Sequence, residues 1–317
     1  MAKGKTVDLN TQDSIKRMLT SISAKKGRAV SESTRETYFI YLRRFCDFCD
    51  KTPDELISER KIQWKSEDIF IRRSQEEKVK EFTEYLREEG YSSNTIATAV
   101  GAIKSLYTSN YHPLMQVNIP SGNPTRIYKI PTKEELTQVI ESAYIPWHAA
   151  FMTLTKDCGI SLQDMLSLKE SDGSPIYGTI KDQLKNGQVP IHLNITREKT
   201  QFKYHTFLGE DSFETMNNMP FHKMRLFPYS DSTIQDAMKN MGDKLGWTSF
   251  TPYSLRKWFR TQLTLDDMND ALIETMMGHS LGRVKAAYLV PPPQKLMEIY
   301  EKHYPALKLN NFLHQIP

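Results

Sequence analysis

Two groups of residues near the carboxyl end of the chain have the types and spacing that phosphate chemistry uses. Segment 251–260 reads TPYSLRKWFR, in which Pro252 favours a helix start and Arg256 and Arg260 fall four residues apart on one helix face. A guanidinium presents a planar fork of hydrogen-bond donors that suits a phosphate. A solvated basic face is the commoner explanation when such a pair stands alone.

The second group is Met277-Gly278-His279-Ser280, which Tyr288 follows nine residues after His279. Tyr288 stands among small apolar residues, so simple packing is the alternative interpretation. The sequence contains no GxxxxGK[ST] phosphate loop, no glycine fingerprint of a dinucleotide-binding fold and no HExxH motif. Nucleotide-driven chemistry is therefore not indicated, and we expect no cofactor.

Cys46 and Cys49 form a CxxC pair, which is a candidate metal or redox motif. A structural zinc site uses four ligands, and the one further cysteine of the sequence is Cys158. Both members of the pair lie on or beside the apolar stripe of an expected helix. Core packing is therefore the favoured interpretation, and we predict no metal site.

Helices dominate residues 29–118. Four are expected there, and their apolar residues recur at helical spacing. They begin at the capping box Ser33-Thr34-Arg35-Glu36, at Thr52-Pro53, at Glu77, and at Ser92 or Ser93. Residues 119–131 contain three prolines and one glycine, so they predict a linker.

Residues 132–317 predict a second domain that is mostly helical. The capping box at Thr132 opens it, with helices expected over 133–141, 147–156 and 161–169. Apolar and polar residues then alternate over 191–196, and a polar break at 197–200 separates this stretch from a second one. This period of two predicts a β-hairpin or a short sheet.

The composition is that of a globular protein of about two domains. The chain has 317 residues, a net charge of +4 and three cysteines. Residues 1–28 hold seven Lys and Arg against two Asp and Glu, which predicts a basic N-terminal arm that binds a polyanion; a solvated tail is the alternative. The sequence shows no apolar signal core and no membrane-spanning run, so we expect a cytoplasmic protein.

Taken together, these elements resemble the tyrosine recombinase family of the phage-integrase type. The matching features are an (H/Y)xxR motif at Tyr253–Arg256, a Gly-His dipeptide at His279, and Tyr288 nine residues later. The interval of 23 residues from Arg256 to His279 is also similar to that of the family. The resemblance implies a mainly α fold with a small β-hairpin. It also implies a SAM-like helical core-binding domain at 29–118 and a catalytic domain with a C-terminal tail helix at 132–317.

The resemblance further implies a site-specific DNA recombinase or integrase. In such an enzyme a tyrosine, here Tyr288, attacks the scissile phosphate and forms a 3′-phosphotyrosine without metal or ATP. Arg256 would clamp the phosphate, while His279 would donate to it or assist the tyrosine. Lys199 in the hairpin would protonate the leaving oxygen, and Tyr253 would add a neutral donor.

Two positions depart from the family pattern. Ser161 stands where the motif G-(L/I)-R-x-x-(E/D)-L has its first arginine, with Asp164 on the acidic position. Tyr253 stands where histidine is commoner. We therefore expect another basic residue to substitute for the arginine that is missing at Ser161. Arg197 is the first candidate, Arg260 the second and Lys156 the third.

The expected partner is double-stranded DNA, held by a clamp of the two domains and bound mainly through phosphate contacts. Individually each candidate contact is more commonly an ordinary surface charge; the candidates are Arg35, Arg43, Arg44, Lys104 and Arg260. A C-terminal helix over 294–304 suggests self-association on DNA as a tetramer, and folding back on its own domain is the alternative.

Two other functions compete with an active recombinase. Ser161 and Tyr253 motivate a catalytically degenerate DNA-binding protein of the same fold. The four other matched groups, which are Lys199, Arg256, His279 and Tyr288, count against it. A related strand-passage or hairpin-forming enzyme that uses the same phosphotyrosine is the third possibility.

Overall fold

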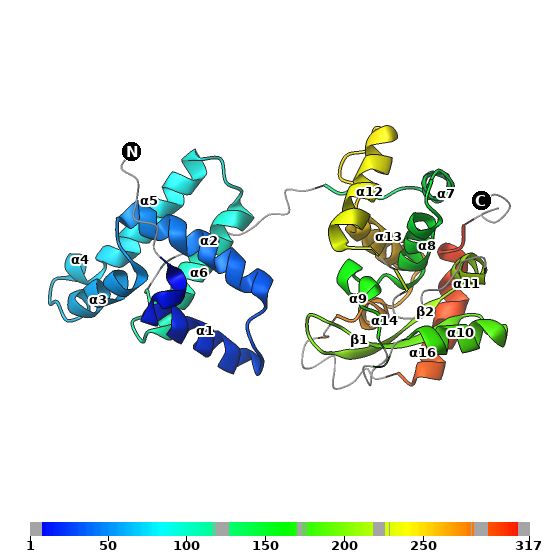
Figure 1. Ribbon diagram of the computed structural model, residues 1–317, viewed down its shortest axis with the longest axis horizontal. Helices are drawn as coiled ribbons and strands as arrows, with labels where there is room; N and C mark the ends of the chain where they lie inside the picture. Colours follow the sequence, from blue (N-terminus) through cyan, green and yellow to red (C-terminus); the bar gives the residue numbers. More distant parts are fainter. Residues whose placement is uncertain are drawn as a thin grey trace. The chain divides into compact units, whose positions relative to one another are not determined.

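The computed structural model divides the chain into two compact units, Met1–Thr125 and Arg126–Pro317 (Figure 1). It describes residues 8–115, 117, 127–169, 174, 176–217, 226–227, 229–279, 281 and 291–309. The predicted nucleophile Tyr288 and most of the predicted linker 119–131 lie outside the described residues.

The first unit is built entirely of helices in its described part. A 3-10 turn at Leu9–Thr11 precedes α1 (Asp13–Lys26), α2 (Glu32–Cys49), α3 (Pro53–Gln63), α4 (Ile69–Arg72), α5 (Ser74–Glu88) and α6 (Ser93–Ser109). Their apolar faces meet in one core that includes Phe45, Phe82 and Leu106. The structure therefore adds the single turn α4 to the four helices expected after residue 29, because one turn is too short to show helical periodicity.

The caps explain where these helices begin. The Thr52 side chain accepts from the backbone of Glu55, whose carboxylate accepts from the backbone of Thr52 in return, so this predicted start is confirmed. Ser92 caps α6 through the backbone of Thr95. The Ser33 capping box is wrong, because α2 already begins at Glu32.

The basic N-terminal segment is not a separate arm over its whole length. Residues Asp13–Lys26 form α1, and Ile15 and Met18 of this helix are fully buried in the core of the first unit. The Asp54 carboxylate accepts from the backbone amides of residues Asp13 and Ser14, which fixes the start of α1 against α3. The positive charges of residues 16–28 are thus carried by a folded element and by the turn that follows it.

Burial accounts for the CxxC pair. Cys46 and Cys49 lie on the inner side of α2, and Phe45 beside them packs edge-on against Phe82. Burial, as the largest cause, raises the pKa of the Cys46 thiol to about 12 and that of Cys49 to about 11. Both thiols are therefore neutral side chains that pack with the core at physiological pH.

The second unit has ten helical elements and two strands in its described part. The helices are α7 (Lys133–Glu141), α8 (Pro146–Cys158), α9 (Leu162–Leu166), α10 (Tyr177–Lys185), α11 (Glu210–Asn217), α12 (Asp231–Lys244), α13 (Pro252–Leu265), α14 (Asp270–Met276), α16 (Pro293–His303) and the 3-10 turn Tyr304–Ala306; the strands are β1 (Ile191–Thr196) and β2 (Lys203–Leu208). The predicted hairpin is confirmed, because β1 and β2 pair antiparallel with Ile191 opposite Leu208. Within the described ranges no helix combines the length and apolar character needed to cross a membrane.

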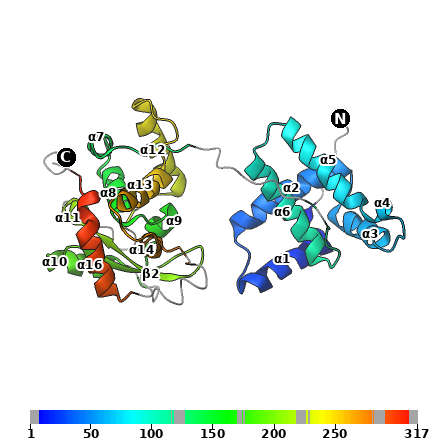
Figure 2. The same cartoon turned by 180° about the vertical axis from the view of Figure 1, so that it is seen from behind.

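Helix α8 lies at the centre of the second unit and packs against α13 (Figures 1 and 2). Every residue from Ala149 to Cys158 is buried. Gly159 ends α8 with a φ of +60°, and a Cβ built there would lie 2.3 Å from the ring of Phe259. Glycine at this position therefore permits both the left-handed turn and the close approach of α13.

Three charged residues form a buried ion network beneath α8. The Nζ of Lys156 lies 2.5 Å from Asp157 and 2.7 Å from Asp211, and all three side chains are at most 2% exposed. Lys156 also donates to the carbonyl of Leu307, and Asp211 accepts from the amide of Leu309. The network therefore fastens the chain after α16 to the interior of its own unit.

Helix α16 folds back on its own unit. Leu296 and Tyr300 are buried in the core, and the Tyr300 hydroxyl donates to the carbonyl of Asp157. Of the two alternatives for residues 294–304, the structure therefore shows the intramolecular one in the single chain.

Candidate active site

Arg256 is the centre of the site, one turn into α13. Its guanidinium is only 5% exposed and donates to the carbonyls of Gly159 (2.5 Å) and Met277 (3.0 Å). Its Nη2 also lies 2.5 Å from Nε2 of His279. Burial, followed by the charge of Arg197, lowers the pKa of Arg256. The two carbonyls hold the guanidinium in place without neutralising its charge.

Residues 277–279 form a turn that carries the imidazole to Arg256. Gly278 has a φ of +68°, and a Cβ built on it would lie 2.6 Å from the ring of Tyr204 on β2. The left-handed conformation and this contact both favour glycine. The Gly-His dipeptide therefore reflects a steric requirement, because the turn after α14 must pass directly over a strand of the hairpin.

His279 lies between a cation and an anion. Its Nε2 faces Arg256, and its Nδ1 forms a hydrogen bond with Oε2 of Glu274 on α14. The largest cause acting on the imidazole is burial, which lowers its pKa, and the charge of Arg256 acts in the same direction. Glu274 opposes both effects.

Arg197 brings a second guanidinium to the same turn. It follows β1 directly, and its Nη1 donates to the carbonyl of Gly278 at 2.8 Å. Its side chain is 16% exposed, and its Nε lies 3.9 Å from Asp164. Arg256 and Arg197 thus donate to the carbonyls of two successive residues. We refer to Arg197, Arg256 and His279 as the cation cluster.

Ser161, at the position of the expected arginine, is a helix cap. Its Oγ accepts from the amide of Asp164 and donates to the Asp164 carboxylate at 2.6 Å. The other carboxylate oxygen of Asp164 accepts from the amide of Glu198 in the hairpin turn. The segment therefore links α9 to the hairpin, next to Arg197.

The two other candidates to replace the arginine missing at Ser161 do not make the contacts that Arg197 makes. Lys156 is held in the buried ion network, so its candidacy is wrong. Arg260 forms ion pairs with Asp270 (2.7 Å) and with Glu274 (2.5 Å) on α14. Its charge is therefore offset within the protein.

Lys199 and Tyr253 are close in sequence to Arg197 and Arg256, respectively, and both lie at exposed positions. Lys199 is exposed in the turn that joins β1 to β2. Tyr253 is 49% exposed, and its ring packs edge-on against Tyr128 at 4.9 Å and near the ammonium of Lys257.

The residues of the first unit that are predicted to contact DNA are exposed or form hydrogen bonds within the unit. Arg35 is hydrogen-bonded to Asn10, and Arg44 to the hydroxyl of Tyr91. The ammonium of Lys104 donates to the carbonyl of Val117 at 3.3 Å. Arg43 is exposed on α2. Their contact with DNA stays a prediction.

Sequence reasoning missed Glu274 and Tyr204. Glu274 lies five residues before His279 on a short helix that also carries Asp270, so no local pattern distinguishes it. Tyr204 alternates with its neighbours in β2 as a buried strand residue would, and its hydroxyl is buried without a hydrogen-bond partner in the described structure. Its electrostatic neighbours are Asp164, Arg256 and Arg197.

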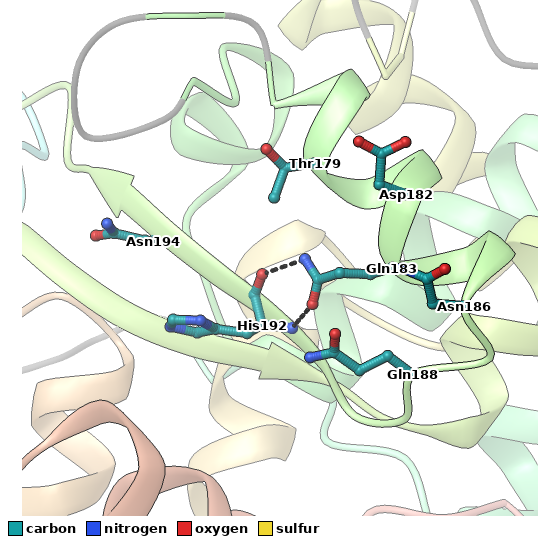
Figure 3. A pocket seen from close by; sticks show the side chains of 7 residues that line it. All are labelled: Thr179, Asp182, Gln183, Asn186, Gln188, His192 and Asn194. Atoms are coloured by element: carbon teal, nitrogen blue, oxygen red, sulfur yellow. Dashed lines mark hydrogen bonds between the residues drawn. The ribbon is translucent and has the colours of Figure 1, made fainter.

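A polar cavity of about 370 Å³ lies elsewhere, between α10 and β1 (Figure 3). Its lining residues are Thr179, Asp182, Gln183, Asn186, Gln188, His192 and Asn194. The Gln183 side chain bonds both the amide and the carbonyl of His192, as the dashed lines in Figure 3 show. None of the predicted catalytic residues lines this cavity.

Comparison with known proteins agrees with this architecture. Residues 17–112 match the family described as "Phage integrase, N-terminal SAM-like domain". The chain is 24% identical over 251 residues to the tyrosine recombinase XerC of Brucella suis biovar 1 (strain 1330), covering 72% of this chain and 77% of that protein. It is 22% identical over 314 residues to XerC of Thermodesulfovibrio yellowstonii, covering 94% and 98%.

Two solved structures share the fold at low sequence identity. The Tn1549 transposon integrase in complex with circular intermediate DNA has a TM-score of 0.54 and 14% identity, covering 90% of this chain and 98% of that one. A lambda integrase dimer bound to a COC′ core site has a TM-score of 0.56 and 14% identity, covering 85% and 96%. These likenesses confirm a mainly helical fold with a small antiparallel sheet.

Proposed function

We propose that the chain belongs to the tyrosine recombinase family and is a site-specific DNA recombinase or integrase. One observation carries the proposal. Arg256, His279 and Arg197 come from three separate segments and converge on one turn, nine residues before Tyr288 in the chain. Converging donors with net positive charge suit a phosphodiester whose oxygens gain charge in the transition state.

In the proposed reaction the hydroxyl of Tyr288 releases its proton to solvent, and its oxygen attacks the scissile phosphorus. A new ester bond forms between the phenolic oxygen and phosphorus, and the bond from phosphorus to the 5′ oxygen of the next nucleotide breaks. Lys199 gives a proton to this leaving oxygen, so a free 5′-hydroxyl results. Attack by another 5′-hydroxyl reverses the chemistry on a new strand, and the ester conserves the bond energy.

Arg256 is proposed to bind a non-bridging oxygen of this phosphate, and His279 to bind the second. Tyr253 is proposed as an additional neutral donor, as its phenol can donate without changing charge. Arg197 takes the role of the arginine that Ser161 replaces. Its support is geometric, because it reaches the Gly278 carbonyl beside the Met277 carbonyl that holds Arg256.

The proposed partner is double-stranded DNA. The solved structures of the Tn1549 integrase and of the lambda integrase are DNA complexes, and the likeness of this chain to them supports the same partner. The candidates in the first unit for phosphate contacts are the basic residues of α1 together with Arg35, Arg43, Arg44 and Lys104. We also propose assembly of a tetramer on DNA, in which α16 would exchange its intramolecular contacts for contacts with a neighbouring copy.

A degenerate DNA-binding protein is the second candidate function, and the Ser161 cap is the observation that favours it. A covalent-trapping experiment separates the two. A binding site is first selected from random duplexes, and the protein is then incubated with versions of that site nicked near each phosphate. An active recombinase leaves a covalent adduct on a denaturing gel, and Tyr288→Phe abolishes it. Binding without an adduct at any nick position would support the degenerate protein.

A further inference from the structure

Glu274 is held between two basic side chains that come from different elements. Its Oε1 lies 2.5 Å from Nη1 of Arg260 on α13, and its Oε2 forms a hydrogen bond with Nδ1 of His279. Arg260 is fixed in turn by Asp270 at 2.7 Å. The Glu274 side chain is 18% exposed. The carboxylate is thus anchored on one side and presents its other oxygen to the imidazole.

These contacts determine which nitrogen of His279 carries the proton. Arg256 has only hydrogen-bond donors, so Nε2 of His279 must accept from it. The proton of a neutral imidazole then lies on Nδ1 and is donated to Glu274. In the free protein, therefore, Nε2 has no proton to offer to a phosphate.

Binding of a phosphate changes this requirement. Once a phosphate oxygen replaces Nε2 as an acceptor for Arg256, His279 can contribute a hydrogen bond from Nε2 only if it takes up a proton from solvent. The product is an imidazolium with one N–H on the phosphate and the other on Glu274.

We propose that Glu274 is a positioning residue of the strand-transfer site. It keeps the Nδ1–H of His279 in place and stabilises the imidazolium that donates from Nε2 to the scissile phosphate. This inference rests on the proposed function for its role in the reaction, while the protonation of His279 can be measured without any reaction.

The charges around His279 support this role. Arg256 and Arg197 both disfavour a positive imidazole, and burial disfavours it further. Among the described groups that act on His279, Glu274 alone favours its charged form. Arg260 lies on the far side of Glu274, where it orients the carboxylate.

Nitrogen NMR of the full chain without DNA tests the proton directly. His279 is assigned by comparison with His279→Asn, and its tautomer and titration are followed in wild type, in Glu274→Gln and in the control Glu141→Gln, which changes an exposed carboxylate at the end of α7. We expect the Nδ1–H tautomer in wild type, and a titration midpoint that falls in Glu274→Gln and stays in Glu141→Gln. An Nε2–H tautomer in wild type, or an unchanged midpoint in Glu274→Gln, would overturn the proposal.

Single-turnover cleavage of the nicked site tests the role in the reaction. Glu274→Gln is expected to slow adduct formation by about 10-fold to 100-fold, as for other groups that orient a functional histidine. The loss should grow as the pH rises from about 6 to about 8, because an imidazole with a lower pKa loses its proton earlier. Glu141→Gln should stay close to wild type at each pH, and Glu274→Asp should recover part of the rate.

The outcomes are distinguishable. A loss in Glu274→Gln that is the same at every pH would show a structural role and contradict the proposal, provided that thermal unfolding confirms a folded variant. If wild type binds its site and forms no adduct, the proposed function fails. The NMR titration then still decides whether Glu274 sets the proton of His279.

Discussion

The second unit contains two groups of buried charged residues that differ in the groups that balance their charge. In the buried ion network, Lys156 faces two carboxylates, and Asp157 also accepts from the amides of Gly209 and Ser212. In the cation cluster, the guanidinium of Arg256 donates to carbonyls and to an imidazole, and no carboxylate contacts it within the described residues.

The difference distinguishes charges that serve folding from charges that are available to a ligand. A buried ion whose partners are complete gains nothing from binding another ion. A buried cation held only by neutral dipoles keeps its charge uncompensated, and an anion that reaches it gains a strong interaction at low dielectric. This contrast supports the proposal that Arg256, within the cation cluster, binds a phosphate.

The largest expected effect is the loss of stability when the ion network is opened. Lys156→Ala leaves two carboxylates buried without their cation, which typically costs about 3–5 kcal/mol of unfolding free energy. Chemical denaturation measures this loss. Adduct formation by the remaining folded protein at low temperature should be near that of wild type. A stable Lys156→Ala variant would show that the network is not closed in the way described.

Removing Arg197 is expected to have the opposite effect to Lys156→Ala, which is a large loss of reaction rate with little loss of stability. Arg197→Ala should lower the rate of covalent adduct formation by about 10²–10³, the usual effect of losing one transition-state donor, with little change in stability or DNA affinity. Adduct formation on nicked DNA and binding by gel shift measure the two quantities. Cleavage by this variant at the wild-type rate would remove Arg197 from the site.

A smaller effect is expected from an anion that resembles the transition state. Orthovanadate should raise the melting temperature of the free protein by binding at the cation cluster, because a ligand that binds only the folded state stabilises it. Arg256→Ala should lose most of this shift, and Lys61→Ala on the first unit serves as a charge-matched control. An equal shift in both variants would place the anion elsewhere.

The smallest effect is expected from Tyr204. Tyr204→Phe removes a buried hydroxyl that has no partner in the described structure, so stability should change by less than about 1 kcal/mol. The ring that packs on Gly278 is retained. A large fall in cleavage at unchanged stability would show instead that this hydroxyl joins the cation cluster when DNA is bound.

Local patterns were sufficient for the elements that carry the site. Pro252 marks the start of α13, the alternation in 191–196 predicts β1, and the Thr132 capping box gives the start of α7. These features depend on neighbours within a few residues, which a sequence displays directly. Helix α9 is shorter than the expected 161–169, because Leu162–Leu166 completes only about one turn before the chain leaves the helix.

Contacts between distant segments could not be read in this way. The prediction that Lys156 could replace the missing arginine is wrong, because its partner Asp211 is 55 residues away in the sequence. The apolar sequence on all sides of α8 does indicate a helix that is buried all round. Glu274 contacts Arg260 from another helix, and only the packing of α13 against α14 brings them together. The roles of the predicted catalytic residues stay predictions until cleavage is measured.

The side-chain amide of Gln183 has a consequence for how this protein can associate. His192 turns its backbone amide and carbonyl away from β2, and Gln183 meets both, at 2.8 Å and 2.9 Å, much as a third strand would. An exposed strand edge is a template for strand addition and aggregation. Because Gln183 occupies this edge at His192, near the start of β1, strand addition between the hairpins of copies brought together at high local concentration is hindered at that point.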